Sequence, residues 1–141
     1  MDINSLERFV KAQELAYPIA LQDIKKGKKR SHWMWYIFPQ LRGLGTSTMA
    51  HKYGIVDLGE AKAYLEHPVL SARLYEFCGE LLKHKDKSAN DMFGDIDAMK
   101  LKSSMTLFAL TSEDYTIFDQ VLEQFFGGEM DEVTVSLINE S

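Results

Sequence analysis

Residues 95–110 read DIDAMKLKSSMTLFAL, and this stretch decides the predicted fold. When it is drawn as a helix, apolar side chains cover most of its circumference, with two small serines, Ser103 and Ser104, between them. The apolar positions are Ile96, Met99, Leu101, Met105, Leu107, Phe108 and Leu110. A helix that is apolar nearly all round is usually buried at the centre of a protein. We therefore expect the rest of the chain to pack around Asp95–Leu110.

Helical spacing recurs on both sides of this stretch. Two amphipathic runs carry apolar residues at that spacing: Leu70, Leu74, Phe77 and Leu81 after Pro68, and Phe118, Val121, Leu122 and Phe125 before Gly127. Thr111 or Ser112 is the predicted cap of the second run. Strand-like alternation is confined to Val133 and Val135, which is a weak signal. The sequence thus predicts an all-α fold, with residues 1–141 forming one compact bundle of about seven helices.

Capping signals predict where the other helices begin and end. Asn4–Glu7 has the pattern of a capping box that opens the first helix. Pro18 suits the first turn of a second helix, which would end at Gly27. Asp57–Glu60 has a second capping-box pattern, and Ser88–Gly94 predicts a short capped turn.

Cysteine usage and hydropathy limit the class of protein. Cys78 is the single cysteine, so neither an internal disulfide nor a cysteine-rich zinc site can form. It follows Phe77 in an amphipathic run, which favours a small buried hydrophobe over a nucleophile.

The N-terminus carries acidic residues and lacks the apolar stretch of a secretory signal. The longest purely apolar run, Trp33–Phe38, is far below the roughly 20 residues needed to cross a bilayer. We therefore expect a cytoplasmic protein without a membrane segment.

The net charge of −5 conceals a gradient along the chain. Residues 1–30 carry +3, residues 31–85 carry +1 and residues 86–141 carry −9. An acidic C-terminal third argues against a general nucleic-acid binder, because neutralisation of phosphates dominates such binding. The basic run Lys25–Arg30 is typical of a solvated loop, and a nucleic-acid patch beside the tryptophans is the sharper alternative.

Both tryptophans lie in Ser31–Gly45, the segment in which we predict a ligand site. The plain interpretation is a short buried helix, capped by Ser31 and broken by Pro39, in which the two indoles are core side chains. The alternative is a pocket, because pockets are largely apolar with a few placed polar groups, and glycines permit close approach of the backbone. The candidate ligand-binding residues here are Trp33, Trp35, Gln40, Arg42, Gly43 and Gly45, and His32 is a candidate acid or base.

A second group of polar residues lies on the predicted central helix. Asp97 and Lys100 are i,i+3 neighbours, and Lys100 and Ser104 are i,i+4 neighbours, so the three share a face. Buried charge is costly unless it is paired, which favours a functional role; an exposed ion pair at the helix N-terminus is the alternative. If both segments line one cleft, Asp97 and Lys100 join His32 as candidate catalytic residues. Arg73, Ser103 and Ser104 complete the candidate ligand-binding set, in which Arg42, Arg73 or Lys100 would hold an anion.

The sequence contains no motif for a metal ion or a cofactor. His51, His67 and His84 lack metal-ligand spacing, and His67 before Pro68 is typical of a helix entry. Neither a P-loop nor a dinucleotide-binding glycine pattern occurs, and nothing singles out a serine for a Ser-His-Asp triad. We therefore predict no metal site and no cofactor.

Four segments carry a family resemblance: residues 32–45, Ala61–Leu65 with His67–Leu70, Phe93-Gly94, and Lys100–Phe108. Through them the chain, from Leu6 to about Thr134, resembles the bacterial domain-of-unknown-function family 1810 (DUF1810). The resemblance implies a small all-helical fold and no established activity. Some members carry the label calpastatin, which is unfounded here because calpastatin repeats are disordered and this composition is that of a packed globule. Ser71 stands where the resemblance leads us to expect glycine, which affects only local helix packing.

Two functional hypotheses follow. The first is a domain that binds or processes a small nucleotide-like or ADP-ribose-like ligand at Ser31–Gly45, where the nucleotide part is an analogy with other small helical domains. The second is a non-enzymatic protein-interaction module that uses the acidic C-terminal third. A cleft beside Arg42 and Lys100 would favour the first hypothesis, and a large exposed apolar patch elsewhere would favour the second. The sequence does not distinguish an enzyme from a binding protein and leaves the oligomeric state open.

Overall fold

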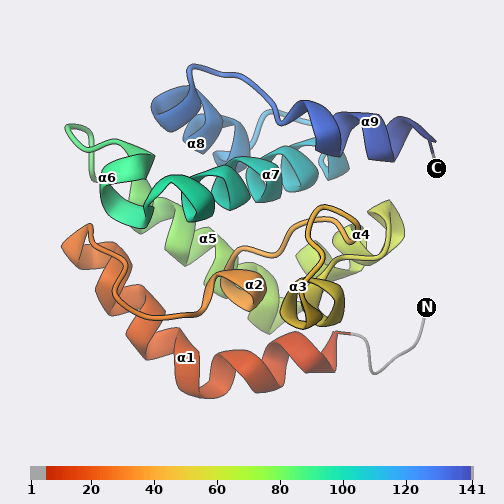
Figure 1. Cartoon of the computed structure of the whole chain (residues 1–141), viewed down its shortest axis with the longest axis horizontal. Coiled ribbons are helices and arrows are strands. Elements are labelled where there is room, and N and C mark those ends of the chain that lie inside the picture. The colour runs from red at the N-terminus through yellow and green to blue at the C-terminus, as the bar shows by residue number, and fades with distance from the viewer. Residues whose placement is uncertain (1–5, 141) are drawn as a thin grey trace.

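The structure, a computed structural model, describes residues 6–140, which form nine α-helices (Figure 1). In chain order these are α1 Glu7–Lys26, α2 Met34–Ile37, α3 Thr48–Tyr53, α4 Leu58–Glu66, α5 Pro68–Leu82, α6 Ala89–Phe93, α7 Asp95–Thr111, α8 Ile117–Phe126 and α9 Glu132–Glu140. Within this range the only β-type pairing is a single bridge between Leu41 and Ile55. The all-α prediction is confirmed, with two more helices than the expected seven or so.

Helix α7 is the centre of the fold, as the sequence predicted. It contacts α4, α6, α8 and α9, and Figure 1 shows it running between α8 and α9 on one side and α2 to α5 on the other. Between Leu101 and Ala109 only Lys102 is not buried. The prediction of burial was wrong at both ends, where Ile96 and Met99 are 73% and 67% exposed and Leu110 is 38% exposed. The helix is therefore enclosed only over its middle.

Helix α1 is a single helix of 20 residues that continues through Pro18, so the predicted break at this residue was wrong. A proline inside a helix lacks the N–H that would bond the carbonyl four residues earlier. Pro18 lies on the exposed side of α1, where water can solvate the freed carbonyl. The predicted end at Gly27 is confirmed, with this glycine in the left-handed conformation at φ 71°. The predicted cap at Asn4 and Ser5 lies outside the described residues.

The start of α4 has one half of the predicted capping box. The Asp57 side chain accepts a hydrogen bond from the Glu60 N–H at 2.9 Å, as expected, and α4 begins at Leu58. The Glu60 carboxylate does not return this bond. It accepts from the Val56 N–H at 3.0 Å and forms an ion pair with Arg8 at 3.0 Å. Glu60 is 1% exposed, so this pair ties α1 to α4 inside the protein.

The cap of α8 is Thr116, and the prediction of Thr111 or Ser112 was wrong. Thr111 is the last residue of α7, and its hydroxyl donates to the Leu107 carbonyl at 2.7 Å. Ser112 bonds back to the Phe108 carbonyl in the same way, at 3.0 Å. Both hydroxyls therefore bond carbonyl groups in the last turn of α7 and are not available to cap α8.

The other caps match the sequence more closely. His67 caps α5 through its Nδ1, which accepts from the N–H groups of Val69 and Leu70, and Ser88 caps α6. Val133 and Val135 lie in α9, so the weak strand signal was wrong. The chain before α9 is fixed to α7 by the Asp131 N–H, which donates to the Thr106 hydroxyl at 2.9 Å.

No helix in the described part of the chain has the length and hydropathy that crossing a membrane requires.

Candidate functional site

Asp23 positions the segment that precedes the candidate site. Its carboxylate is buried and accepts three hydrogen bonds, from the N–H groups of Arg30 and Ser31 at 3.1 and 3.2 Å and from Trp33 Nε1 at 2.9 Å. Trp33 is thereby held in the core, where it is 1% exposed and packs edge-on against Phe93. The chain then enters α2, where the Trp35 side chain is directed toward Lys100 of α7 and not into the core beside Trp33.

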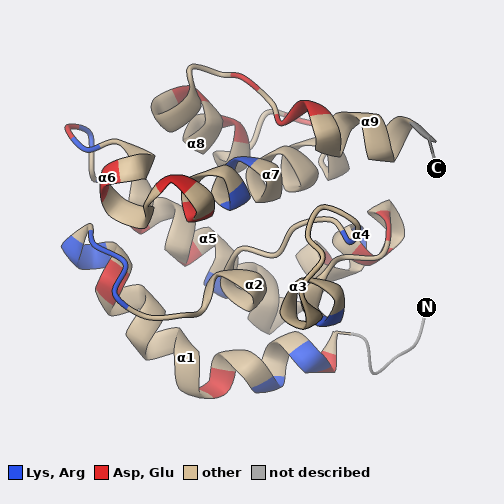
Figure 2. Cartoon of the chain, viewed as in Figure 1, with Lys and Arg blue, Asp and Glu red and all other residues tan. Residues whose placement is uncertain are grey.

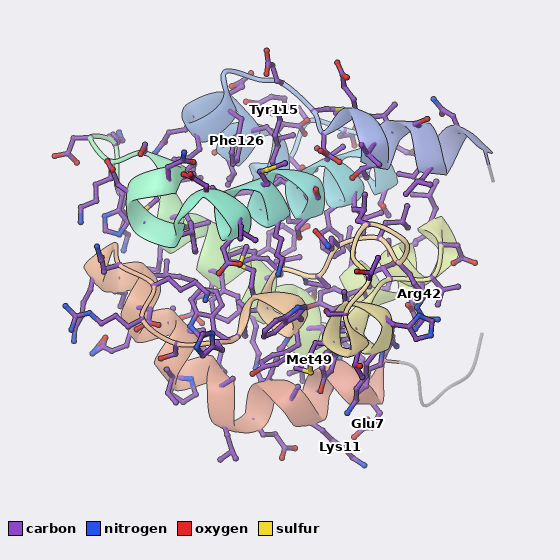
Figure 3. The ribbon with its side chains drawn as sticks, viewed as in Figure 1. Glu7, Lys11, Arg42, Met49, Tyr115 and Phe126 are labelled. Carbon is purple, nitrogen blue, oxygen red and sulfur yellow. The ribbon has the colours of Figure 1, made fainter. Side chains whose placement is uncertain are left out.

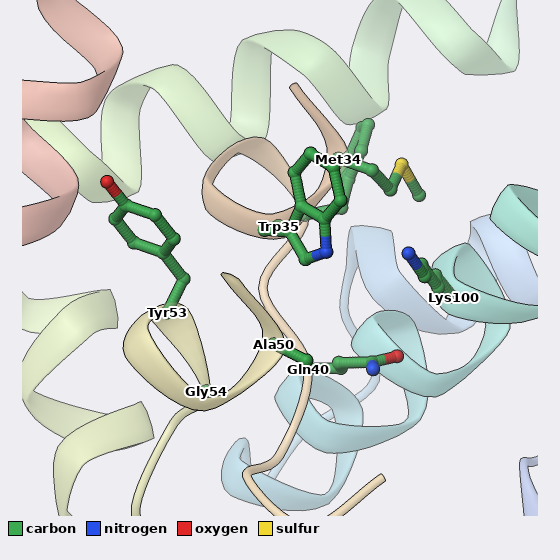
Figure 4. A pocket seen from close by; sticks show the side chains of 8 residues that line it. Met34, Trp35, Gln40, Ala50, Tyr53, Gly54 and Lys100 are labelled. Carbon is green, nitrogen blue, oxygen red and sulfur yellow. The ribbon is translucent and has the colours of Figure 1, made fainter. Parts of the chain in front are cut away.

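A pocket of about 240 Å³ opens where α2, α3 and α7 meet (Figure 4). It is lined by Met34, Trp35, Phe38, Gln40, Ala50, Tyr53, Gly54 and Lys100, and we call it the Trp35 pocket. Its free space is narrow, since it admits little more than one water molecule in this conformation. Figure 4 shows the side chains of Trp35 and Lys100 pointing toward each other across it, with Gln40 at one edge.

Lys100 supplies the only charged group in the pocket lining. Its ammonium lies 4.9 Å from the centroid of the Trp35 ring, a cation–π contact. It also lies 3.8 Å from Oδ1 of Asp97, whose Oδ2 makes a shorter pair with Lys29 at 2.9 Å. Lys29 in turn lies 5.0 Å from the ring centroid of Trp33. One carboxylate therefore serves two ammonium groups, and the group of three carries one positive charge in excess.

These three charges are substantially shielded from water. The side chains of Lys29, Asp97 and Lys100 are 8%, 20% and 24% exposed. Charge interactions strengthen when water is excluded, and an uncompensated charge becomes more costly for the same reason. Lys100 is the less closely compensated of the two lysines, because Asp97 is closer to Lys29.

The apolar wall of the Trp35 pocket is well supported from behind. Tyr53 packs edge-on against Tyr36, with ring centroids 5.1 Å apart, and its other neighbour is Phe9 at 6.1 Å. Gly54 brings the backbone close, because a Cβ there would lie 2.7 Å from the Arg42 Cα. The wall is therefore held by packing of α1, α2 and α3 and is not a loose surface feature.

The structure brings Trp35, Gln40 and Lys100 into this pocket, with Asp97 behind Lys100, and leaves the other candidate residues elsewhere. Arg42 points away, and its Nε donates to the His51 carbonyl at 2.9 Å. The predicted clamp of Arg42 and Lys100 on one anion is therefore not assembled in this conformation.

His32 and Arg73 also lie apart from the pocket. His32 is exposed and lines a surface groove beside α1. Arg73 of α5 faces α1, where its guanidinium carbon lies 4.9 Å from the ring centroid of Tyr17 and its Nη1 donates to Gln13 at 3.4 Å. The predicted catalytic grouping of His32 with Asp97 and Lys100 is consequently not formed.

The serines and glycines have packing roles in this structure. The Ser103 hydroxyl donates to the Met99 carbonyl at 3.1 Å, whereas the buried Ser104 hydroxyl has no hydrogen-bond partner. Gly43 lies in an exposed turn at φ 107°. A Cβ on Gly45 would come within 2.7 Å of the Ala50 Cβ, so this glycine lets the loop pack on α3.

Sequence reasoning missed the part of the pocket that α3 contributes. Ala50, Tyr53 and Gly54 line it, and α3 was not among the predicted helices. The available signal was Ser47, which caps α3 by accepting from the Ala50 N–H at 3.0 Å. Within residues 6–140 no three His, Cys, Asp or Glu side chains gather closely enough to hold a metal ion.

Comparison with known proteins gives a family and a fold. The family described as "Protein of unknown function (DUF1810)" matches residues 3–138. A crystal structure of the conserved hypothetical protein Rv1873 from Mycobacterium tuberculosis is similar, with 44% sequence identity and a TM-score of 0.95. The similarity covers 98% of this chain and 99% of that protein. No protein of curated function matches the sequence.

Proposed function

Because this chain belongs to the DUF1810 family, whose description assigns no function, we propose one from its own pocket: it binds a small anionic molecule with a planar group in the Trp35 pocket. The planar group would lie against the indole of Trp35, and the anionic group would pair with Lys100. The Gln40 amide, which can both donate and accept, would fix the orientation.

The incomplete pairing of Lys100, whose carboxylate partner is 3.8 Å away and closer to Lys29, is the observation that supports this proposal most strongly. Asp97 is shared with Lys29, so Lys100 is only partly compensated although three quarters of its side chain is shielded. The indole face offers a weak partner for an ammonium group compared with a true counter-ion. An anionic ligand would supply that counter-ion in a site where water is largely excluded.

The volume of the pocket limits the size of the ligand. Pockets for drug-sized molecules typically hold about 300–1,000 Å³, whereas the Trp35 pocket, about 240 Å³ with the open solvent at its mouth included, has room for about one water molecule in this conformation. A single ring with one anionic substituent would therefore enter only when the Trp35 and Lys100 side chains move apart. A nucleotide-like or ADP-ribose-like molecule would therefore be enclosed only in part, with one ring or one phosphate inside.

The lining favours binding over catalysis. It supplies one cation, one amide and aromatic faces, and its only groups of a type that transfers protons are Lys100 and the Tyr53 hydroxyl, which Figure 4 shows turned away from Lys100. Binding is accordingly the activity that we propose.

Ligand-dependent thermal stability, read together with tryptophan fluorescence, tests the proposal. The probes are aromatic carboxylates, nucleoside monophosphates and ADP-ribose, and any that binds the native state raises the melting temperature. Binding in the pocket should also change the fluorescence of Trp35. In a Trp35→Phe variant, which retains buried Trp33, that change should disappear.

Two lysines of α7 provide a matched comparison. Lys100→Met removes the charge from the pocket and keeps an apolar stem, and we expect it to weaken binding at least about tenfold. Lys102→Met removes the same charge from the same helix outside the pocket, where Lys102 pairs with Glu129, and should leave binding unchanged. Equal losses in both variants, or no shift with any probe, would contradict the proposal.

A protein-interaction module remains the second candidate, supported by the surface of the C-terminal third. Figure 2 shows acidic residues along α8 and α9 and the chain between them. Tyr115 and Val133 are 61% and 56% exposed among these charges. A partner would therefore be basic with apolar anchors, and binding that salt weakens would be expected.

A further inference from the structure

A surface groove runs along one flank of α1, between this helix and the segment that leads into α2. One wall is formed by Lys11, Ala12, Leu15, Ala16 and Ile19, and the other by residues of the segment 31–36. The groove continues toward the N-terminal end of α1, because Lys11 and Ala12 also line a second hollow, which α3 borders on the far side. Figure 3 shows Lys11 pointing away from the body of the protein. We call this hollow the α1 groove.

The middle of the α1 groove is apolar. Leu15 is 86% exposed and Ile19 is 50% exposed, while the half-buried Ala12 and Ala16 line the groove with small side chains. Residues 15–22 contain no charged side chain, which Figure 2 shows as an uncoloured stretch of α1. An exposed apolar surface that is hollowed between two walls is typical of a site that receives the apolar face of a helix.

The end of the groove at the C-terminus of α1 is basic. Four exposed cations gather there: Lys25, Lys26, Lys28 and Arg30. Lys26 follows Ile19 by seven residues, which places it on the same flank of α1, and Arg30 directly precedes Ser31 in the opposite wall. Lys29 does not add to this charge, because it pairs with Asp97 at 2.9 Å. Both walls therefore end in unpaired positive charge.

No exposed carboxylate in this part of the chain offsets the four cations. Asp23 is the only acidic residue between positions 15 and 36, and its buried carboxylate already accepts three N–H groups. The other end of the groove is balanced, since exposed Glu7 and Glu14 accompany Lys11 and Lys52. Figure 2 shows the resulting change along α1, which turns blue at its C-terminal end. A partner of the groove is thus apolar along one face and acidic at one end.

We infer that the α1 groove binds a short amphipathic helix of another protein, and that this helix is acidic in its first turn. Its apolar side chains lie against Leu15, Ile19 and Tyr36, and its acidic residues lie near Lys26 and Arg30. Acidic residues in a first turn also complement the dipole of their own helix, so the partner runs antiparallel to α1. The stretch of α1 from residue 12 to residue 26 is about 21 Å long, which about 14 residues of helix span.

The shape of the surface favours a helix over a membrane. A flat bilayer would touch the rims of the α1 groove and leave its apolar floor uncovered. Glu14 is exposed next to Leu15, where anionic headgroups would repel it. A helix that enters the groove avoids both costs.

Binding of a synthetic peptide tests this inference. The probe is a fluorescein-labelled helical peptide of about 14 residues, with glutamates in its first turn and leucines spaced i, i+3, i+4 and i+7. Its anisotropy should show saturable binding to the wild-type chain with a dissociation constant below about 100 µM. Leu15→Ser should weaken binding at least about tenfold, because it removes the most exposed apolar side chain of the groove.

Ile96→Ser is the matched control, because Ile96 is 73% exposed and lies on α7, outside the groove. It should leave binding of the peptide unchanged. Absence of binding up to about 1 mM protein, or equal losses in the two variants, would overturn the inference.

A charge exchange tests the acidic end of the partner separately. The double variant Lys26→Glu with Arg30→Glu should weaken binding about tenfold. A second peptide with lysines in place of the glutamates should bind this variant as tightly as the first peptide binds the wild type. Both positions are exposed, so the fold is retained. An exchanged peptide that binds the double variant no better than the first one does would contradict the assigned polarity.

Two further measurements address the other occupants of the groove. Vesicles of phosphatidylserine and phosphatidylcholine test a membrane, and sedimentation of the wild-type chain alone tests a second copy. We expect neither vesicle binding nor dimerisation. Either one, if Leu15→Ser abolished it and Ile96→Ser did not, would assign the groove to that occupant and overturn the inference.

Discussion

Ser104 is the one buried side-chain oxygen or nitrogen in the described residues for which no partner is present. A buried hydroxyl without a hydrogen bond costs about 1–3 kcal/mol of desolvation. Ser104→Ala should therefore raise the free energy of unfolding by about 1 kcal/mol, measured by urea denaturation. Ser103→Ala is the control, because its hydroxyl donates to the Met99 carbonyl, and it should be near neutral. Destabilisation by Ser104→Ala would show instead that a buried water satisfies the hydroxyl.

Asp23 acts on stability through the three donors that its carboxylate accepts. Asp23→Ala leaves the Trp33 indole N–H and two backbone N–H groups unpaired, so we expect a loss of about 3 kcal/mol in the free energy of unfolding. The emission of Trp33 should also shift to the red as water reaches it. Asp86→Ala, at an exposed position, should change stability by less than about 0.5 kcal/mol. Similar effects in the two variants would contradict this role.

The two tryptophans illustrate what sequence alone decides at the scale of a residue. Side chains two positions apart in a helical turn do not share a face, so one indole in the core and one at the surface could be expected. Which of them is buried depends on Asp23, which lies on another helix and binds Trp33. That contact leaves no local pattern in the sequence.

At the scale of elements, Gly54 joins the end of α3 to the loop that carries Arg42. A Cβ at this position would lie 2.7 Å from the Arg42 Cα and 2.9 Å from the Ala50 carbonyl oxygen, and neither backbone atom can move freely. Gly54→Ala should cost about 2 kcal/mol or more of stability and weaken ligand binding in the Trp35 pocket. Gly79→Ala in α5 meets nothing within 4 Å and should stabilise the protein by about 0.5–1 kcal/mol. Thermal and urea unfolding of both variants measures this contrast, which would fail if the two changed stability alike.

The sequence predicted where the main helices lie better than it predicted the residues at which they begin and end. The apolar periodicity of α5 and α8 and the nearly continuous apolar surface in the middle of α7 reflect burial, which the local sequence records directly. The continuation of α1 through Pro18 has a different origin, because it depends on packing of the helix on both sides of the proline. Thr111 and Ser112 have the composition of a cap, but the same hydroxyls can bond backwards to the preceding turn, and sequence does not distinguish the two uses.

At the scale of the whole molecule, Cys78 reports on global opening. It is fully buried next to Met105, which confirms the prediction of a small core residue, and burial raises the pKa of its thiol. Thiolate is the reactive form, so the folded protein should react with a thiol reagent only through unfolding. The labelling rate should rise with denaturant in parallel with the unfolded fraction. Rapid labelling in buffer alone would contradict the enclosed position.

The sequence predicted an all-α architecture around α7 because both follow from composition and period. It did not predict how the candidate residues are distributed, since this depends on contacts between distant segments. Trp35 of α2 and Lys100 of α7 converge through their side chains, whereas His32 and Arg42 flank the same short helix and face other surfaces. Polar residues close in sequence were therefore a poor guide to a shared site.

The sharing of Asp97 between two lysines has a consequence for any molecule that enters the Trp35 pocket. When an anion takes over Lys100, Asp97 is left to Lys29, which sits on the chain just before Trp33. Occupancy would then tighten the connection between α7 and the loop that joins α1 to α2, and by reciprocity a tightened connection would raise affinity. Filling the pocket and holding the segment before Trp33 against α7 would then be thermodynamically linked through a single carboxylate.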